Sequence, residues 1–337
     1  MLVCMLTHLW LVKTPTTGQK NKTLIDKPLY NISRPNPLEK GETVGLLALA
    51  CKVDFEILKP AIKLMENVWG LKVILGESLT SEYHQFAGTD EIRANDFQVM
   101  LDNPEIKAIF SVRGGYGSSR LLDNIDFSAF QKSPKWVIGF SDITAVHCHI
   151  HTLNIESLHA TMPKLFLQEG GEKSLESLRK ILFGKSLSYQ ILPHEMNRLG
   201  VGEGQIIGGN LALLSHIISS KSDINYDNKI LFLEDVNEYL YNIDRMMIQL
   251  KRSGKLQNLA GLIVGSFSDC QDNQVPFGKT ANEIIEEAIL DYNFPVCYNF
   301  PVGHEVENWA IPCGRAVVLK VGSDGVLLEE VLNPYQI

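Results

Sequence analysis

The sequence lacks the basic clusters and long apolar runs that mark nucleic-acid-binding and membrane-spanning proteins. Its 31 basic and 39 acidic residues give a net charge of −8, and no basic cluster is long enough to follow a phosphate backbone. The apolar segment 1–12 is too short to cross a bilayer and has no positively charged start, which argues against a signal peptide. We therefore expect neither a nucleic-acid nor a membrane partner, with secretion as the alternative to a cytoplasmic location.

Cysteine is absent from the spacings that bind zinc or form a disulfide framework. The six cysteines include no C-x-x-C pair and are scattered along the chain: Cys4, Cys51, Cys148, Cys270, Cys297 and Cys313. Free thiols persist in a reducing compartment, so this pattern predicts a cytoplasmic protein.

Motifs for phosphate and metal binding are present only in part. The glycine-rich run 113–117 (RGGYG) could present amides to an anion, but it matches neither G-x-G-x-x-G nor the P-loop. His147 and His151 have the spacing of a zinc helix, yet Cys148 stands where H-E-x-x-H has its glutamate. We expect these imidazoles to be hydrogen-bonded on a helix that packs against a sheet, with a bound metal as the alternative.

The residues that are present are typical of a globular protein, because 45% are hydrophobic and 21% are charged. A length of 337 residues corresponds to roughly two domains. We expect a flexible N-terminal extension over 1–34, an N-terminal α/β domain over 35–164, a linker over 165–198 and a C-terminal α/β domain over 199–337.

Short apolar runs alternate with amphipathic stretches from residue 42 onward, which indicates an α/β fold. In the N-terminal part, helices are expected at 60–69 and 90–101, and strands at 43–48, 71–75, 107–112 and 135–139. This order predicts a parallel, Rossmann-like sheet whose ligands bind at the carboxyl ends of the strands. In the C-terminal part, a mixed α/β domain is expected, with helices at 211–218, 237–252 and 280–292, strands at 229–233, 262–267 and 296–300, and a hairpin at 315–331.

Ser141 stands at the corner where the strand that ends at Gly139 meets a helix that begins at Asp142. A serine on such a tight turn is lifted clear of the sheet, and the amides that follow it point toward the oxyanion that its attack creates. Gly139 and Ser141 fit the G-x-S-x-G nucleophile elbow, but Ile143 replaces the second glycine. Ser141 is therefore either a nucleophile or a buried hydroxyl that caps the helix.

A serine nucleophile needs a base, and His304 is a candidate because it follows a predicted strand and turn. The alternative is a histidine in a surface loop. Glu234 closes the strand 229–233, where a semi-buried carboxylate needs a partner. That partner could be a histidine, as in a serine triad.

An ion pair with a helical arginine is the other explanation for Glu234, and Arg245 and Arg252 are available on the helix expected at 237–252. Asp235 and Glu238 compete with Glu234 for the triad role. We expect both of them to lie beyond the strand end, nearer solvent.

Six motifs follow one another over residues 36 to 335: 37–45 (PLEKGETVG), 113–117 (RGGYG) with 119–122 (SRLL), 139–144 (GFSDIT), 208–211 (GGNL), 231–235 (LFLED) with Glu238, and 301–304 (PVGH) with 311–314 (IPCG). In this order they resemble the LD-carboxypeptidase family of serine carboxypeptidases, which includes muramoyltetrapeptide carboxypeptidases and microcin C immunity peptidases. The resemblance implies two α/β domains, with the serine in the first and the acid and base in the second.

The resemblance implies that Ser141 is the nucleophile, His304 the general base and Glu234 the residue that orients it. It also implies that the backbone amides of Gly115 and Asp142 form the oxyanion hole. The implied reaction releases the terminal D-alanine from the tetrapeptide of recycled cell-wall muropeptides, without metal or organic cofactor. Members of the family are commonly homodimers.

The chain departs from the family pattern in two loops, because it reads 48–51 (ALAC) where relatives often have Pro-Ser, and 219–221 (SSK) where they have Gly-Thr. These loops bear on the substrate contacts and leave the three triad residues unchanged. Arg113 is a candidate receptor for the terminal carboxylate or, alternatively, a structural anchor. Tyr116 and Trp309 could stack on a base if the substrate were a peptidyl-nucleotide antibiotic. A non-catalytic protein that binds an anionic ligand is the alternative from a different class.

Overall fold

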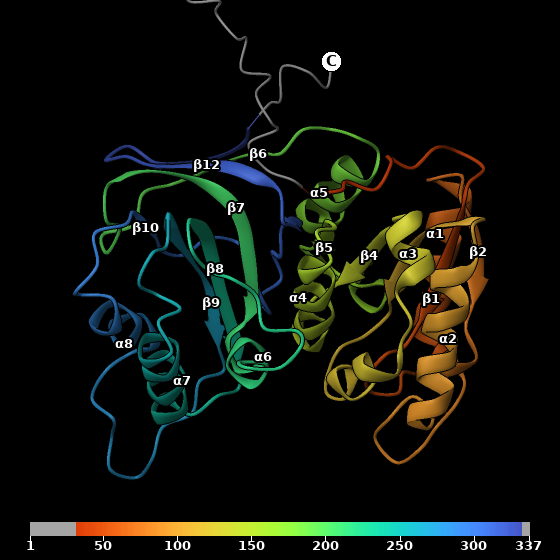
Figure 1. The fold of residues 1–337 in the computed structure, drawn as a ribbon, viewed down its shortest axis with the longest axis horizontal. Coiled ribbons are helices and arrows are strands. Elements are labelled where there is room, and N and C mark those ends of the chain that lie inside the picture. Colours follow the sequence, from red (N-terminus) through yellow and green to blue (C-terminus); the bar gives the residue numbers. More distant parts are fainter. Residues whose placement is uncertain (1–31, 332–337) are drawn as a thin grey trace, which may run out of the picture.

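The structure is a computed structural model that describes residues 32–331, so most of the expected extension 1–34 lies outside the described residues. Two sheets lie side by side, each with its own helices (Figure 1). The first sheet has the order β11-β5-β4-β3-β1-β2. Its parallel strands are β1 (Thr43–Leu47), β2 (Lys72–Leu75), β3 (Ile106–Ser111), β4 (Trp136–Gly139) and β5 (Ser157–His159). The parallel, Rossmann-like arrangement expected for the N-terminal half is therefore confirmed.

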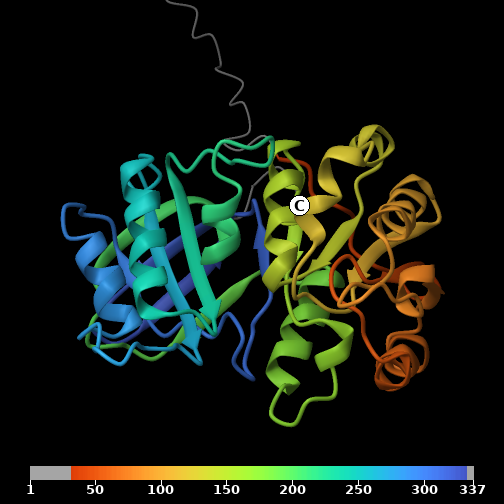
Figure 2. The ribbon, with the colours of Figure 1, turned by 90° about the horizontal axis from the view of Figure 1, so that it is seen from below.

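Two helices of the first half begin where the sequence offers a start signal. Pro60 stands in the first turn of α1 (Lys59–Asn67), where its missing amide hydrogen costs nothing. The Thr89 side chain accepts a hydrogen bond from the amide of Ile92 and caps α2 (Asp90–Asp102). Two further helices complete this half, α3 (Ser128–Lys132) and α4 (Thr144–Thr152). Figures 1 and 2 both show α4 at the junction of the two halves.

The second sheet is mixed, as expected, with the order β10-β9-β8-β7-β12-β13-β6. Its parallel part comprises β7 (Gly200–Asn210), β8 (Lys229–Val236), β9 (Gly261–Ser268) and β10 (Val296–Cys297). Its antiparallel part comprises β12 (Ala316–Val321), β13 (Val326–Glu330) and β6 (Ser188–Ile191). The helices of this half are α6 (Leu211–His216), α7 (Leu240–Arg252) and α8 (Ala281–Ala288).

Two segments connect the halves more closely than a simple linker would. Residues 165–198, expected to be a linker, contain α5 (Glu172–Leu182) and the edge strand β6. In the other direction, β11 (Ile311–Cys313) leaves the C-terminal half and pairs antiparallel with β5 of the first sheet. The proposed domain boundaries stay a prediction.

Strand β8 is longer than the sequence suggests. Its ladder with β9 continues past Leu233 to Val236, so Glu234 and Asp235 lie inside the strand, 0% and 3% exposed. The expectation that Asp235 is nearer solvent is therefore wrong. Glu238 does lie beyond the strand and accepts a hydrogen bond from Asn242.

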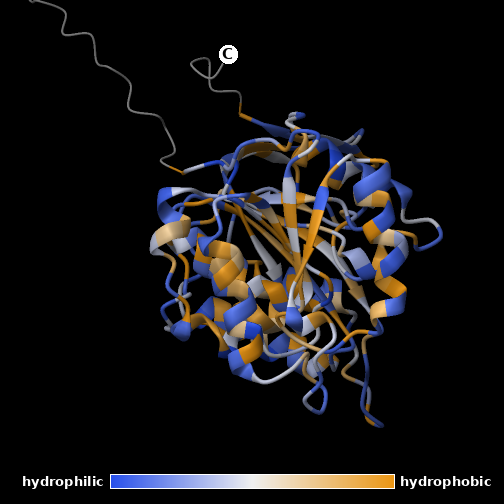
Figure 3. Cartoon of the chain, turned by 90° about the vertical axis from the view of Figure 1, so that its right-hand side faces the viewer, coloured by the Kyte–Doolittle hydropathy of each residue, from blue (hydrophilic) through white to orange (hydrophobic). Residues whose placement is uncertain are grey.

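Burial follows the hydrophobic pattern on each element. On α7, the buried residues Ile243, Met247 and Leu250 recur at helical spacing and face the core, whereas polar residues face outward. Figure 3 shows the same division, with hydrophobic strands inside and hydrophilic segments on the outer helices. Transfer of this apolar surface out of water drives the association of the two sheets and their helices.

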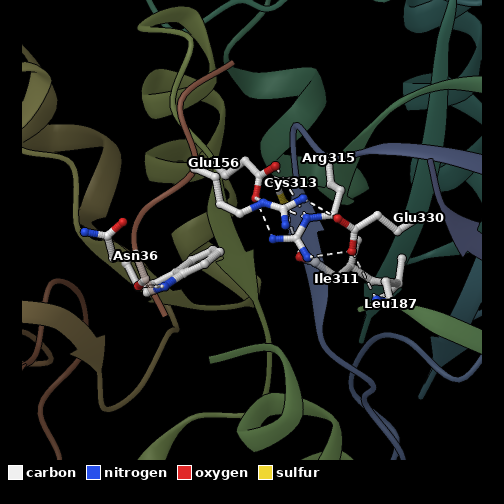
Figure 4. Close-up of polar contacts among 9 residues, drawn as sticks. Asn36, Glu156, Leu187, Ile311, Cys313, Arg315 and Glu330 are labelled. Atoms are coloured by element: carbon white, nitrogen blue, oxygen red, sulfur yellow. Dashed lines mark hydrogen bonds and ion pairs between the residues drawn. The ribbon is translucent and has the colours of Figure 1, made fainter. Parts of the chain in front are cut away.

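A buried ionic cluster joins the two sheets (Figure 4). Arg315, between β11 and β12, is 3% exposed; its Nη2 lies 2.7 Å from Glu156 Oε2, and its Nη1 lies 3.3 Å from Glu330 Oε2. Glu156 precedes β5 of the first sheet, and Glu330 belongs to β13 of the second. Arg34 pairs with the same two carboxylates. The cluster neutralises charges that would otherwise be costly to bury at this junction.

Removal of the Glu156 charge should destabilise the protein, because the buried Arg315 would then keep only one of its two carboxylate partners, Glu330. We expect Glu156→Gln to lower the free energy of unfolding by about 3 kcal/mol. Glu329→Gln is the control, since its partner Lys320 and Glu329 itself are 52% and 41% exposed; a change below about 1 kcal/mol is expected there. Urea-induced unfolding measures both, and equal losses would contradict the importance of the cluster.

Candidate active site

Ser141 occupies a strained turn at the carboxyl end of β4. Its φ of 64° lies in the left-handed region, which a non-glycine residue adopts at an energetic cost. An added Cβ on Gly139 would lie 2.9 Å from Ile143 Cγ1, so the turn can close only with glycine at this position. The short 3₁₀ helix Ser141–Ile143 and α4 after it have no side-chain cap, so the capping role considered for Ser141 is wrong.

The glycine-rich run 113–117 passes directly beside this serine. A Cβ added to Gly114 would lie 2.9 Å from Ser141 Cβ and 3.1 Å from Ser141 Oγ. The two motifs meet because β3 and β4 are parallel neighbours, whose carboxyl ends share one edge of the sheet. Glycine at 114 therefore leaves room around the hydroxyl.

Two hydrogen bonds fix the loop against the turn. The Asp142 carboxylate accepts from the amide of Ser118 at 2.8 Å, and the Asp142 carbonyl accepts from the Ser118 hydroxyl at 2.7 Å. The backbone amides of Gly115 and Asp142 donate to no acceptor within residues 32–331. Both amides are thus free to donate to a ligand. Sequence reasoning does not single out Ser118, although its place directly after the glycine-rich run is a signal.

His304 and Glu234 form the most direct polar contact of the site. His304 Nδ1 lies 2.6 Å from Glu234 Oε2, and the centre of the His304 ring lies 4.9 Å from that of Phe140, the residue before Ser141. Gly303 permits this approach: its φ is 129°, and an added Cβ would lie 2.9 Å from Glu234 Cβ. The imidazole is therefore held beside the turn that carries Ser141.

This contact decides between the alternatives for both residues. The His304 side chain is only 18% exposed, so it is not a surface-loop histidine. Glu234 has no arginine partner among the described residues, and Arg245 instead contacts Asn242. The ion-pair explanation for Glu234 is therefore wrong.

Electrostatics at the pair favour a charged imidazole. Burial lowers the pKa of His304, but the hydrogen bond that its Nδ1 donates to Glu234 and the charges of Glu234 and Asp235 outweigh it, so the pKa is raised above its ordinary value of 6.5. For Asp235, burial and the charge of Glu234 raise the pKa to about 7. Asp235 therefore influences the pair through its charge, while its hydrogen bonds go elsewhere.

The three candidate binding residues lie in different places. Arg113 is half-buried and donates a hydrogen bond to the Lys52 carbonyl, which makes it in part an anchor. Burial and the charge of Arg113 lower the pKa of Lys164, so a second cation lies nearby. Tyr116 is 50% exposed in the loop beside Ser141. Trp309 lines a separate cavity of about 400 Å³ near α5 and β6, to which the serine, histidine and glutamate do not contribute.

Of the two histidines with the spacing of a zinc helix, His151 has a buried Nδ1 without a hydrogen-bond partner among the described residues, so the expectation of hydrogen-bonded imidazoles is wrong for this ring. His147 has partners for both ring nitrogens. Its Nδ1 lies 2.9 Å from Ser157 Oγ and its Nε2 lies 2.8 Å from the Gly139 carbonyl oxygen. Burial lowers the pKa of His147 to about 4. No group of three or more His, Cys, Asp or Glu side chains in residues 32–331 is arranged to hold a metal ion. In the same part of the chain, no helix has the length and apolarity needed to cross a membrane.

Family models match both halves of the chain. Residues 44–160 match the LD-carboxypeptidase N-terminal domain, and residues 203–319 match the LD-carboxypeptidase C-terminal domain. The "Probable murein peptide carboxypeptidase" of Bacillus subtilis (strain 168) is 32% identical over 301 residues, which is 88% of this chain and 94% of that protein. The "Murein tetrapeptide carboxypeptidase" of Pseudomonas aeruginosa is 31% identical over 290 residues, covering 82% of this chain and 92% of the relative.

Solved structures agree with these matches. The crystal structure of muramoyltetrapeptide carboxypeptidase from Oxalobacter formigenes superimposes with a TM-score of 0.77 at 25% identity and covers 87% of this chain and 99% of its own. The wild-type microcin C7 self immunity protein has the same fold, with a TM-score of 0.79 at 23% identity, and covers 90% of this chain and 99% of its own. The fold, the two family-model matches and the relatives above 30% identity lead to one conclusion: the chain belongs to the LD-carboxypeptidase family of serine-type peptidases.

Proposed function

We propose that this LD-carboxypeptidase releases the terminal D-alanine from murein tetrapeptide by way of an acyl-enzyme on Ser141. The observation that carries the proposal is the 2.6 Å contact between His304 and Glu234, in a histidine that packs beside the nucleophile turn. The functions named for the Bacillus, Pseudomonas and Oxalobacter relatives support the substrate class.

The mechanism follows from which atoms are engaged. His304 Nδ1 is hydrogen-bonded to Glu234, so Nε2 is the ring nitrogen that can take the proton of the Ser141 hydroxyl. The serine oxygen attacks the scissile carbonyl, and the amides of Gly115 and Asp142 donate to the oxyanion. His304 then protonates the departing amine, and water, activated by the same imidazole, hydrolyses the ester.

Charge at the loop supports recognition of a free carboxyl terminus. Arg113 directly precedes Gly114, which packs against Ser141, and Lys164 adds a second positive charge. A guanidinium binds a carboxylate through charge-assisted hydrogen bonds. We propose that Arg113 receives the carboxylate of the terminal D-residue and that Tyr116 flanks the substrate.

We further propose that the enzyme acts in the cytoplasm on recycled wall peptides, as a homodimer. All cysteines in residues 32–331 are free, which supports a reducing compartment. The dimer rests on the family resemblance alone, and light scattering of the purified protein would report its mass.

An immunity-type peptidase is the second candidate, because half-exposed Tyr116 offers a stacking surface beside Ser141. Parallel assays of a murein tetrapeptide and an aminoacyl-sulfamoyl-adenosine, followed by mass spectrometry, separate the two functions. Faster cleavage of the tetrapeptide supports the proposal, and cleavage of the adenosine compound alone would overturn it.

Ser141→Ala should abolish release of D-alanine while the protein stays folded, because the change removes one oxygen from a half-buried side chain that caps no helix. We expect turnover to fall by at least about 10⁴-fold. Mass spectrometry of the tetrapeptide before and after incubation measures the loss of D-alanine. Ser133→Ala, at an exposed serine after α3, is the control. Full release by the Ser141→Ala enzyme would rule out this nucleophile.

The pKa of His304 should depend on the Glu234 charge. In the wild type we expect its imidazole to titrate above 6.5 by NMR, and the acidic limb of kcat/KM to follow it, because only the neutral ring acts as a base. In Glu234→Gln the burial remains and the charge is lost, so the pKa should fall. Glu305→Gln changes the exposed residue next to His304 and should leave the pKa of His304 unchanged. An unchanged titration in Glu234→Gln would contradict the pairing.

Arg113→Gln should weaken binding of a free carboxyl terminus. We expect KM for the tetrapeptide to rise roughly 10- to 100-fold, whereas KM for the same peptide with a C-terminal amide should change little. Steady-state kinetics with the two substrates measure this selectivity. Lys107→Gln removes an exposed charge from the other end of β3 and serves as the control. A selectivity for the free acid that persists in Arg113→Gln would exclude Arg113 as the receptor.

A further inference from the structure

The nucleophile turn touches the second sheet at Thr144, the first residue of α4. The Thr144 side chain has no exposed surface, and its Oγ1 accepts a hydrogen bond from the backbone amide of Asn210 at 3.0 Å. Asn210 is the last residue of β7 and the N-cap of α6. One hydrogen bond therefore connects the segment that carries Ser141 to the half that carries Glu234 and His304.

Gly209 allows the two backbones to approach this closely. Its φ is 139°, and an added Cβ would lie 2.4 Å from Thr144 Oγ1 and 2.8 Å from Thr144 Cγ2. Any side chain at position 209 would push α4 away from β7. Gly209 is thus required by the contact between the halves, whereas Gly208 lies against the backbone of Phe232 in its own sheet.

On the far side of the contact, Asn210 is held by Asp235. Asn210 Nδ2 donates to Asp235 Oδ1 at 2.8 Å, and Asp235 Oδ2 accepts from the amide of Ala212 at 2.9 Å. Asp235 directly follows Glu234 in β8, and the register of β7 with β8 sets Asn210 opposite Glu234. Buried hydrogen bonds therefore continue from the nucleophile turn to the strand that carries the acid.

We infer that Thr144, Asn210 and Asp235 are positioning residues that hold the Ser141 hydroxyl in register with the His304 imidazole across the junction of the two sheets. The inference rests on the proposed triad. Reacting groups on separate elements need such support, because a displacement of about 1 Å can lower turnover about 100-fold.

Thr144→Val tests the contact, since it removes the acceptor oxygen and keeps the branched shape. We expect kcat for the tetrapeptide to fall about 100-fold, with KM close to that of the wild type. Thr144→Ser keeps the oxygen and should recover most of kcat. Asp235→Asn disturbs the hydrogen bond between Asp235 and Asn210 and should also lower kcat. This second variant tests the inference if Thr144→Val does not fold.

Ser222→Ala is the matched control, because Ser222 Oγ lies 3.0 Å from His149 Nδ1 and makes another contact to α4, nearer its C-terminus. We expect its kcat to equal that of the wild type. A purely structural role of Thr144 would lower the urea midpoint and leave kcat per folded molecule unchanged, and that result would overturn the inference. Turnover by Ser141→Ala would instead overturn the triad itself.

Discussion

The hydrogen bond between Glu234 and His304 is the interaction on which the site depends. Glu234 is a carboxylate with no exposed surface, and an unpaired charge in such a place is costly. The imidazole at 2.6 Å supplies the partner, and the same contact leaves only one ring nitrogen for proton transfer. One pair of atoms thus meets a requirement of stability and a requirement of the proposed mechanism.

Close backbone approaches surround this pair. Gly303 permits the approach of His304 to Glu234, Gly114 leaves room beside Ser141, and Gly209 admits Thr144 against β7. At each of these positions a side chain would occupy space that a functional group or its support already fills. Ser141 itself has a left-handed conformation, a strain that the packed turn around it maintains.

Much of the site could be predicted from the chain because its residues fall at strand ends in an alternating pattern. Ser141 and the glycine-rich run both follow strands of the predicted parallel sheet, and the pairing of β3 with β4 sets their carboxyl ends side by side. The end of β8 was less predictable. The sequence predicts Glu234 at the strand end and Asp235 beyond it, because acidic side chains rarely belong to a buried ladder. Pairing with β9 carries the strand through both of them.

By itself the sequence determined the class of fold and the chemical identity of the groups, since periodicity specifies local structure and an alcohol, an imidazole and a carboxylate have fixed reactivities. Only the tertiary structure decided which groups meet. It brought His304 to Glu234 and left Arg245 with Asn242, and it placed Trp309 in a separate cavity. It also joined Thr144 to Asn210. These contacts link residues far apart along the chain, and packing between two sheets, which no local pattern encodes, sets their distances.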